Sequence, residues 1–337
     1  MPVAQAFMAF QRHQIYDVVI TDGEHIGIPL ALLLKMTGSK VAHVTIGHRL
    51  STSKKRRFFR WLRVHSHMTR IAVHSKLQYA IATSELGIPE RQLRVIPWQA
   101  DPQFWCPQPV PEERMVSSAG LEHRDYPTLF RAVEGLDAQV VVGAASHWSK
   151  QPNTALGVDR PANVDVQSFD YPALRDVFAR SSVVVVPLFD VDFQAGVTTI
   201  LEAMSMGKAV IVTQAAGQTD VVEDRRLGRT GPAMRPRPIS LLRDLAEAAG
   251  VPVEPNGLYV PPSDPAALRR AIEYLLDHPD ERARLGSAAR RTVERFMTVE
   301  HFAARMSAWA EGVDVSPDIV PDGISWHEAG APVASAT

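Results

Sequence analysis

The segment VVVVPLFDVDFQAGVTTILEAMSMGKAVIVT, residues 183–213, decides the fold. Its run of four valines predicts a buried parallel strand that ends at Pro187. A polar loop follows, and a helical pattern then covers about residues 197–206 until Gly207 stops it. Residues 209–213 form the next strand. In a parallel sheet the loop and the helix amino terminus lie at the carboxyl ends of the strands, where free N–H groups and the helix dipole favour phosphorylated ligands.

Strand and helix patterns alternate through most of the chain. Strands are also expected at residues 16–21, 41–45, 70–73, 93–97, 115–119, 138–142 and 256–260. Helices are expected at residues 4–14, 29–36, 53–65, 126–134, 171–180, 265–276, 280–295 and 299–311. Alternating elements of this size predict an α/β fold with parallel, doubly wound sheets.

The chain is long enough for two domains, and its 45% hydrophobic residues can supply two cores. We expect one Rossmann-like domain over residues 1–105 and a second over residues 106–298. Residues 225–255 contain five prolines and many charges, and we expect them to form a surface insertion in the second domain. A last helix is expected within residues 299–312, and residues 313–337 have the composition of a disordered tail.

Charge and cysteine content exclude several classes of protein. A formal net charge of −1 argues against a chain that binds nucleic acid over its whole surface. The single cysteine, Cys106, excludes an internal disulfide framework and fits a reducing compartment. The sequence has no signal-peptide pattern, and no apolar run approaches about 20 residues. We therefore expect a cytoplasmic protein that is bound at most peripherally to the cytoplasmic face of the membrane.

The order of residues in the opening segment resembles one family. Glu202, eight positions after Gln194, matches the second carboxylate of the "Glu, seven residues, Glu" signature of retaining GT-B glycosyltransferases of the large "glycosyl transferases group 1" (family 4) type. Gly207-Lys208-Ala209-Val210-Ile211 is similar to the "G-x-P-V-I" strand of that family. Three further segments resemble the family's hinge, the opening of its carboxyl-terminal domain and its late "G-x-x-V-x-P-x-D" passage, namely residues 71–107, 117–132 and 256–276.

The resemblance implies a GT-B fold, in which two Rossmann-like domains with parallel sheets face one another across a cleft. Residues 1–105 would be the acceptor-side domain, which is short because the family's opening strand and Gly-rich loop have no counterpart here. Residues 106–298 would bind the nucleotide-sugar, and the helix within residues 299–312 would cross back onto the first domain. These roles of the two domains are implied by the family resemblance and not by composition or periodicity.

The implied reaction moves a sugar from a nucleotide-diphosphate donor to an acceptor hydroxyl with retention of configuration. The acceptor would be a sugar, a lipid-linked compound or a small molecule, and no metal or other cofactor is expected. An alternative is a catalytically impaired GT-B-like subunit that binds a nucleotide-sugar or a partner protein. A GT-B epimerase ranks lower, because epimerases lack the LEAM–GKAVIVT order.

The resemblance also assigns roles to single residues. Glu202 would accept hydrogen bonds from the ribose hydroxyls, and the N–H groups of Gly196 and Val197 would contact the sugar or the phosphate. Arg124, in the loop after Gly120, would neutralise the leaving diphosphate. The predicted catalytic residues are Gln194, His48 and Arg124, and the predicted donor-binding residues are Glu202, Gly196, Val197, Asp192 and Gly120.

The acidic loop leaves two questions open. Gln194 stands where the family has a carboxylate, so either its sugar contact is geometric or Asp192 supplies the negative charge. Asp190 and Asp192 also form an Asp-x-Asp pair, which holds a divalent metal in GT-A transferases. The two-domain pattern favours GT-B, which needs no metal. Leu121 replaces an arginine that is usual in the family.

Residues 54–63, KKRRFFRWLR, place six cations and four large apolar residues in ten positions. A helix of this kind could lie on an anionic bilayer with its aromatic rings inserted. It could equally bind an anionic acceptor, or be an ordinary helix with a solvated face. Nucleic acid is not an expected partner, because the rest of the chain is not basic.

Overall fold

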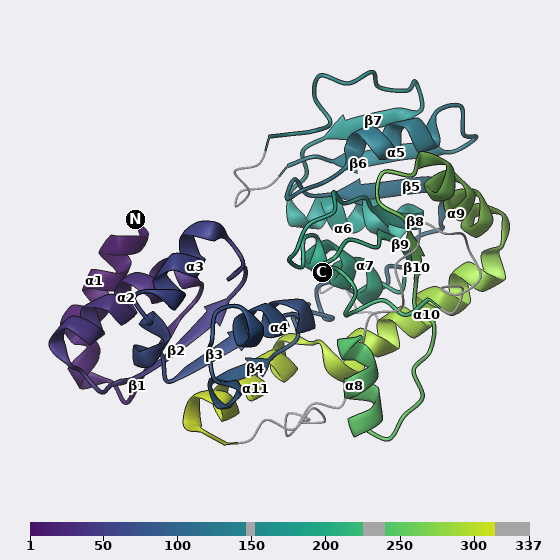
Figure 1. Ribbon diagram of the computed structural model, residues 1–337. Helices are drawn as coiled ribbons and strands as arrows, with labels where there is room; N and C mark the ends of the chain where they lie inside the picture. Colours follow the sequence, from purple (N-terminus) through teal and green to yellow (C-terminus); the bar gives the residue numbers. More distant parts are fainter. Residues whose placement is uncertain (146–151, 225–239, 314–337) are drawn as a thin grey trace, which may run out of the picture.

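The structure is a computed structural model that describes residues 1–145, 152–224 and 240–313. It contains two parallel sheets, each flanked by helices, as the α/β prediction requires (Figure 1). The first sheet has the order β1-β2-β3-β4, with strands β1 Val18–Thr21, β2 Ala42–Gly47, β3 Arg70–Val73 and β4 Leu93–Val95. The α-helices of this part are α1 Pro2–Arg12, α2 Glu24–Thr37, α3 Ser53–Arg60 and α4 Lys76–Ser84. Short 3-10 helices are η1 His13–Ile15, η2 Val64–His67 and η3 Glu90–Gln92.

The second sheet has six strands in the order β10-β9-β8-β5-β6-β7. Its strands are β5 Glu113–Ala119, β6 Gln139–Gly143, β7 Val164–Gln167, β8 Ser181–Val186, β9 Ala209–Thr213 and β10 Leu258–Val260. The remaining helices are α5 Tyr126–Val133, α6 Tyr171–Arg180, α7 Val197–Ser205, α8 Leu241–Ala248, α9 Pro265–Asp277, α10 Pro279–Phe296 and α11 Val299–Glu311. The chain leaves β5 in one direction and later returns to β8 on its other side. A crevice forms at such a reversal of strand order, outside the carboxyl ends of the two strands.

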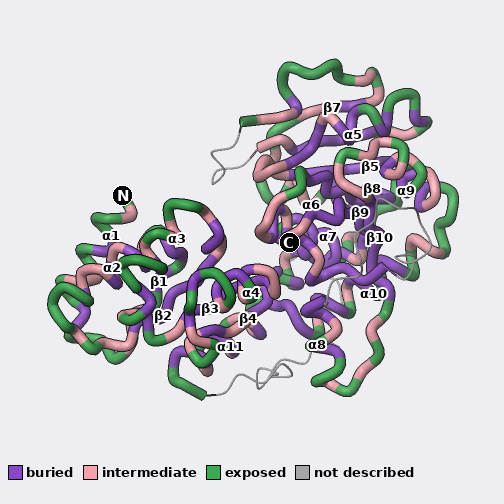
Figure 2. Tube along the Cα trace, viewed as in Figure 1, coloured by how far each residue is buried: buried purple, intermediate pink, exposed green. Residues whose placement is uncertain are grey.

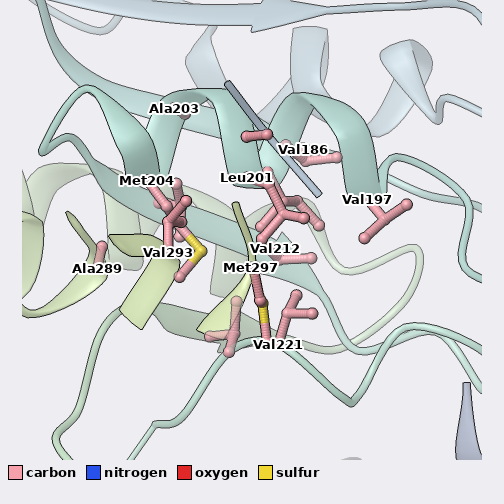
Figure 3. Packing of buried hydrophobic residues seen from close by; sticks show 14 of the residues in the cluster. Val186, Val197, Leu201, Ala203, Met204, Val212, Val221, Ala289, Val293 and Met297 are labelled. Atoms are coloured by element: carbon pink, nitrogen blue, oxygen red, sulfur yellow. The ribbon is translucent and has the colours of Figure 1, made fainter. Parts of the chain in front are cut away.

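The core around α7 holds the strand–helix–strand unit in place. Figure 3 shows Leu201 and Met204 of α7 packed over the sheet, with Val293 of α10 beside them. All three side chains are fully buried, and burying each one stabilises the fold by roughly 1.5–3 kcal/mol. Helix α10 approaches so closely that a Cβ on Gly286 would lie 2.0 Å from the carbonyl oxygen of Gly207. Glycine at position 286 is therefore required by the helix packing.

The last helix, α11, lies against the first sheet although it follows the second domain in sequence (Figure 1). Met306 and Trp309 of α11 share a hydrophobic cluster with Val44 and Ala72 of that sheet. The Arg70 guanidinium donates a 3.0 Å hydrogen bond to the carbonyl of Ala310. The chain thus links its two halves twice, once before β5 and once before α11.

Three expectations need correction. Residues 225–239 lie outside the described residues, but the rest of the expected surface insertion is not superficial, because α8 buries Leu241, Leu242 and Leu245 in the large core around α7. Strand β7 was not expected, because Val164–Gln167 alternates too briefly to stand out from a loop. The basic helix is shorter than expected and ends at Arg60.

One of the three interpretations of that helix, insertion of its aromatic rings into a bilayer, does not fit the positions of two of its residues. Phe59 is fully buried and is not available to lipid, and Phe58 is partly buried against the same core. Helix α3 is held against the domain by ion pairs from Lys55 to Glu24 and from Arg56 to Glu85. None of the helices in residues 1–145, 152–224 and 240–313 is long and apolar enough to span a membrane. The expected tail beyond residue 313 lies outside the described residues.

Candidate active site

A cavity of about 450 Å³ lies between the two sheets, where the carboxyl ends of their strands face one another. On the first domain it is lined by residues that come within three positions after β2, β3 and β4, namely His48, His74, Ser75 and Trp98. Its wall on the second domain includes Gly120, Arg124, Gly143, Phe169, Tyr171, Gln194, Gly196, Val197, Thr199 and Glu202. Seven of the eight predicted site residues line this cavity, and Asp192 does not.

Glu202 is a buried carboxyl group on the cavity wall. It lies on α7, its exposed fraction is 7%, and no hydrogen-bond donor to its side chain is found among the described residues. Burial raises the pKa of this carboxyl to about 8, against the opposing effect of the positive charge of Arg124. Because the side chain lines the cavity and no described protein group donates to it, its carboxyl oxygens are free to accept hydrogen bonds from whatever occupies the cavity.

Arg124 forms the floor of the cavity and is itself almost fully buried. Its guanidinium donates to the carbonyls of Ala119 and Glu122 at 2.8 and 2.9 Å and to Thr199 Oγ1 at 3.1 Å. A guanidinium has five N–H donors, so these three hydrogen bonds fix the plane of the group and leave further N–H donors free. Arg124 therefore joins the loop after β5 to the first turn of α7 and brings positive charge to the cavity.

Two glycines allow Arg124 to occupy this position. Gly120 and Gly196 both have positive φ angles, +94° and +77°, which favour glycine. A Cβ on Gly120 would lie 2.6 Å from Arg124 Nη2. A Cβ on Gly196 would lie 2.8 Å from Val186 Cγ1 and 3.0 Å from Arg124 Nη1. Because Gly196 is the N-cap of α7, the backbone can turn sharply there and present the amino end of the helix, at Val197, to the cavity.

Gln194 is held by a carboxylate that was not anticipated. Its Nε2 donates a 3.5 Å hydrogen bond to Asp220 Oδ2, and its Oε1 is buried without a partner in the described structure. Asp220 also accepts hydrogen bonds from the backbone N–H groups of Lys76 and Leu241. Burial raises the pKa of Asp220 to about 6, which these hydrogen bonds oppose. Asp220 lies 26 residues after Gln194, and no spacing in the sequence indicates the contact.

His48 belongs to an aromatic cluster on the first domain. Its Nε2 lies 3.1 Å from Asp22 Oδ1, and this hydrogen bond lowers the pKa of Asp22. The ring of Trp98 lies 5.6 Å from that of His48 and 4.6 Å from that of His74, measured between ring centroids, and both contacts are edge-to-face. His74 was not among the predicted site residues, but it lines the cavity, and its Nε2 has no partner among the described residues.

The charge state of His74 follows from its surroundings. The side chain is buried, and its Nδ1 lies 2.8 Å from the carbonyl of Ile96. Burial lowers the pKa of His74 to about 4, and the positive charge of a protonated His48 acts in the same direction. A neutral ring that donates from Nδ1 leaves Nε2 as an acceptor. At neutral pH His74 thus carries an unpartnered hydrogen-bond acceptor beside the cavity.

Asp192 joins the two domains. Its carboxylate forms a 2.9 Å ion pair with Arg49 of the first domain, and its backbone carbonyl accepts a 2.7 Å hydrogen bond from Gln78. The Arg49 guanidinium also lies 4.7 Å from the centroid of the Phe193 ring. Asp190 instead accepts a hydrogen bond from the backbone N–H of Ala216. Within the described ranges, no group of three or more His, Cys, Asp and Glu side chains is placed to hold a metal ion.

Two family models match the carboxyl-terminal part of the sequence. The model described as "Glycosyl transferases group 1" matches residues 122–278, and the one described as "Glycosyl transferase-like" matches residues 253–308. The first match includes the whole loop and helix from Gln194 to Glu202. A search of curated proteins found no significant match.

The chain is also similar to solved structures at low sequence identity. HepE from Anabaena, in complex with UDP, is 14% identical with a TM-score of 0.67, and the match covers 91% of this chain and 82% of that one. A glycosyltransferase from Rickettsia africae is 15% identical with a TM-score of 0.63, covering 92% and 80%. Sucrose-phosphate synthase from Thermosynechococcus elongatus is 18% identical with a TM-score of 0.61, covering 90% and 75%. These likenesses show the fold, which is the GT-B arrangement of two domains.

Proposed function

We propose that this chain, whose residues 122–278 match the model described as "Glycosyl transferases group 1", moves a sugar from a nucleotide-diphosphate donor to an acceptor hydroxyl with retention of configuration. The observation that carries the proposal is the unpaired, buried carboxyl of Glu202 at the cavity. A sugar or ribose diol offers two O–H donors to one carboxylate, and a charge-assisted pair of this kind orients a ligand strongly. The cavity is also large enough for a small-molecule ligand.

In the proposed complex the ribose lies on Glu202 and the diphosphate lies over the amino end of α7. Gly196 and Val197 there present backbone to the cavity, and the helix dipole favours negative charge at this end. Arg124, fixed beneath Gly196, adds a full positive charge close to the same place. Together they stabilise the charge that develops on the departing diphosphate, so this mechanism calls on no metal ion or other cofactor.

The transferred sugar and the acceptor would lie between Gln194 and the first domain. Gln194 offers a buried amide oxygen and an amide nitrogen shared with Asp220. His48, held by Asp22, lies on the facing domain. Retention would follow from attack of the acceptor on the face from which the diphosphate leaves. The acceptor class we propose is a sugar, a lipid-linked compound or a small molecule that carries a hydroxyl group.

One observation favours a second candidate function, a catalytically impaired subunit that binds nucleotide-sugar without turning it over. Gln194 cannot carry the negative charge of the usual carboxylate, and Asp192 is already paired with Arg49. If charge at this position is indispensable for transfer, the cavity would bind the donor and release nothing. The two candidates therefore share the donor site and differ only in turnover.

Titration calorimetry with nucleoside diphosphates tests the shared donor site. Since HepE is seen with UDP and with UDP-glucose, UDP is the first ligand to try, followed by the guanosine and adenosine diphosphates. We expect one of them to bind, and Glu202→Ala to weaken that binding by more than about 1 kcal/mol. Glu247→Ala, on the exposed face of α8, is the matched control and should bind as the wild type does. Equal affinity in wild type and Glu202→Ala would refute the assignment of Glu202.

Release of nucleoside diphosphate from the matching nucleotide-sugar separates the two candidates. Release that depends on an added acceptor supports the transferase. Saturable binding without release, for every acceptor class tried, supports the impaired subunit. We infer that either activity belongs to the cytoplasm, with peripheral attachment to the membrane, because the chain carries one cysteine and a strongly basic segment.

A further inference from the structure

Large apolar side chains are exposed at the end of the first sheet where its strands begin. Ile15 and Tyr16 precede β1, Met36 comes shortly before β2, and Trp61 and Leu62 precede β3. The exposed fractions of Ile15, Met36 and Trp61 are 73%, 83% and 77%. Because the strands are parallel, segments that enter them meet at the same edge of the sheet. We call these five residues the distal rim.

Contacts within the domain support this placement. The Lys35 ammonium donates a 2.6 Å hydrogen bond to the carbonyl of Leu62, which brings the end of α2 beside the turn after α3. The 3-10 helix η2, which follows that turn, packs along α2. The cavity lies at the opposite, carboxyl edge of the sheet, beside His48 and His74. Figure 2 shows much of the chain exposed at the end of this domain that lies away from the second domain.

The distal rim is surrounded by positive charge. Five exposed cations lie in the same entering segments, namely Arg12, Lys35, Lys40, Arg60 and Arg63. No ion pair is found for any of the five within the described residues, and Asp17 is the one acidic residue in those segments. Residues 25–84 contain eleven Lys and Arg and no Asp or Glu. The neutral overall charge of the chain therefore conceals a basic amino-terminal domain.

We propose that the distal rim is a docking surface for an anionic lipid bilayer. Exposed tryptophan beside arginine is suited to the boundary between headgroups and acyl chains, where an amphipathic ring inserts and cations meet lipid phosphates. Charge complementarity selects anionic lipid, because each Lys or Arg close to such a surface adds to binding. A nucleic-acid partner would use the cations and leave the apolar tips of Met36, Trp61 and Leu62 in water.

Docking through the distal rim differs from binding by an amphipathic helix that lies flat on the membrane. Phe59 stays in the core and Phe58 packs against it, so the domain instead contacts the bilayer through the distal rim. The cavity then opens about one strand length from the lipid surface, roughly 15 Å for a strand of four or five residues. Membrane binding would therefore leave the donor site accessible, and the proposal stands independently of the transfer reaction.

Vesicle flotation of the full-length chain tests the proposal. We expect the chain to float with mixed phosphatidylcholine–phosphatidylglycerol vesicles and to stay behind with phosphatidylcholine alone. The double variant Trp61→Ala/Leu62→Ala and the charge reversal Arg60→Glu should each weaken vesicle binding on the order of tenfold. Arg270→Glu, an exposed arginine on α9 of the second domain, is the matched control for charge and should bind as the wild type does.

Thermal unfolding of each variant serves as the check on folding, since exposed positions should leave the midpoint unchanged. Failure to float with anionic vesicles would overturn the proposal. So would equal binding by the wild type and both rim variants, or an equal loss in Arg270→Glu. If Arg60→Glu instead abolished binding to a DNA duplex, or if Trp61→Ala/Leu62→Ala converted a dimer to a monomer in light scattering, without any vesicle binding, the rim would belong to that other partner.

Discussion

Replacement of Glu202 by glutamine should change both the pH dependence of nucleotide binding and the stability of the empty protein. The raised pKa of about 8 means that only about one in eleven Glu202 side chains is ionised at pH 7, and about ten in eleven at pH 9. If the ribose hydroxyls bind the carboxylate, affinity should rise about tenfold across this interval. Binding at pH 7 should also release close to one proton. Glutamine removes both effects while keeping the side chain's shape.

The assay is titration calorimetry at several pH values, in pairs of buffers with different ionisation enthalpies. The ratio of wild-type to Glu202→Gln affinity cancels the titration of the nucleotide itself, so the ratio should carry the tenfold change. A ratio that stays constant between pH 7 and pH 9, with the same proton release in both proteins, would refute the reasoning. It would show that the carboxyl does not ionise on binding, even if Glu202 touches the ligand.

The same pKa makes a prediction about stability, and its sign is opposite to that of binding. The folded-state pKa lies above the ordinary value of 4.5, so the protonated form favours the folded state. This stability is complete below about pH 4.5 and is lost as the pH rises through about 8, with an upper bound on the order of 4–5 kcal/mol. Glu202→Gln should therefore unfold at a higher urea concentration than the wild type at pH 9, and the difference should shrink toward pH 5.

Three other substitutions test the fold and the site. Gly196→Ala places a Cβ against Val186 and Arg124 at a positive φ. The free energy of unfolding, measured by urea titration, should therefore fall by about 1–3 kcal/mol. An unchanged unfolding midpoint would contradict the proposed backbone strain at this position. Asp22→Asn removes the charged partner of His48. Acceptor-dependent release of nucleoside diphosphate should slow about tenfold or more at unchanged UDP affinity, whereas a changed affinity with normal turnover would assign the pair to binding alone. Leu201→Ala opens the core and should cost about 2–5 kcal/mol of unfolding free energy, and a loss below about 1 kcal/mol would mean that the core is loosely packed.

Local patterns in the sequence were sufficient for most of the fold. Strands β3 and β9 and helix α11 occupy the residues expected for them, because each is a run of neighbouring residues with one period. The resemblance of residues 183–213 to one family also placed Gln194 and Glu202 at the carboxyl ends of the strands of a parallel sheet, where the cavity is found. The short strand β7 and the buried helix α8 were missed, because four residues hold too little periodicity and a proline-rich flank concealed the helix.

Only the tertiary structure determined which residues distant in sequence form hydrogen bonds and ion pairs with one another. The contact of Gln194 with Asp220, the ion pair of Asp192 with Arg49 and the bonds that hold Arg124 each join residues that no periodicity relates. The sequence by itself determined which residue types stand at the ends of the strands. Folding decided which of them are buried, and burial sets both their pKa values and their freedom to meet a ligand, because desolvation depends on every segment that packs around a side chain.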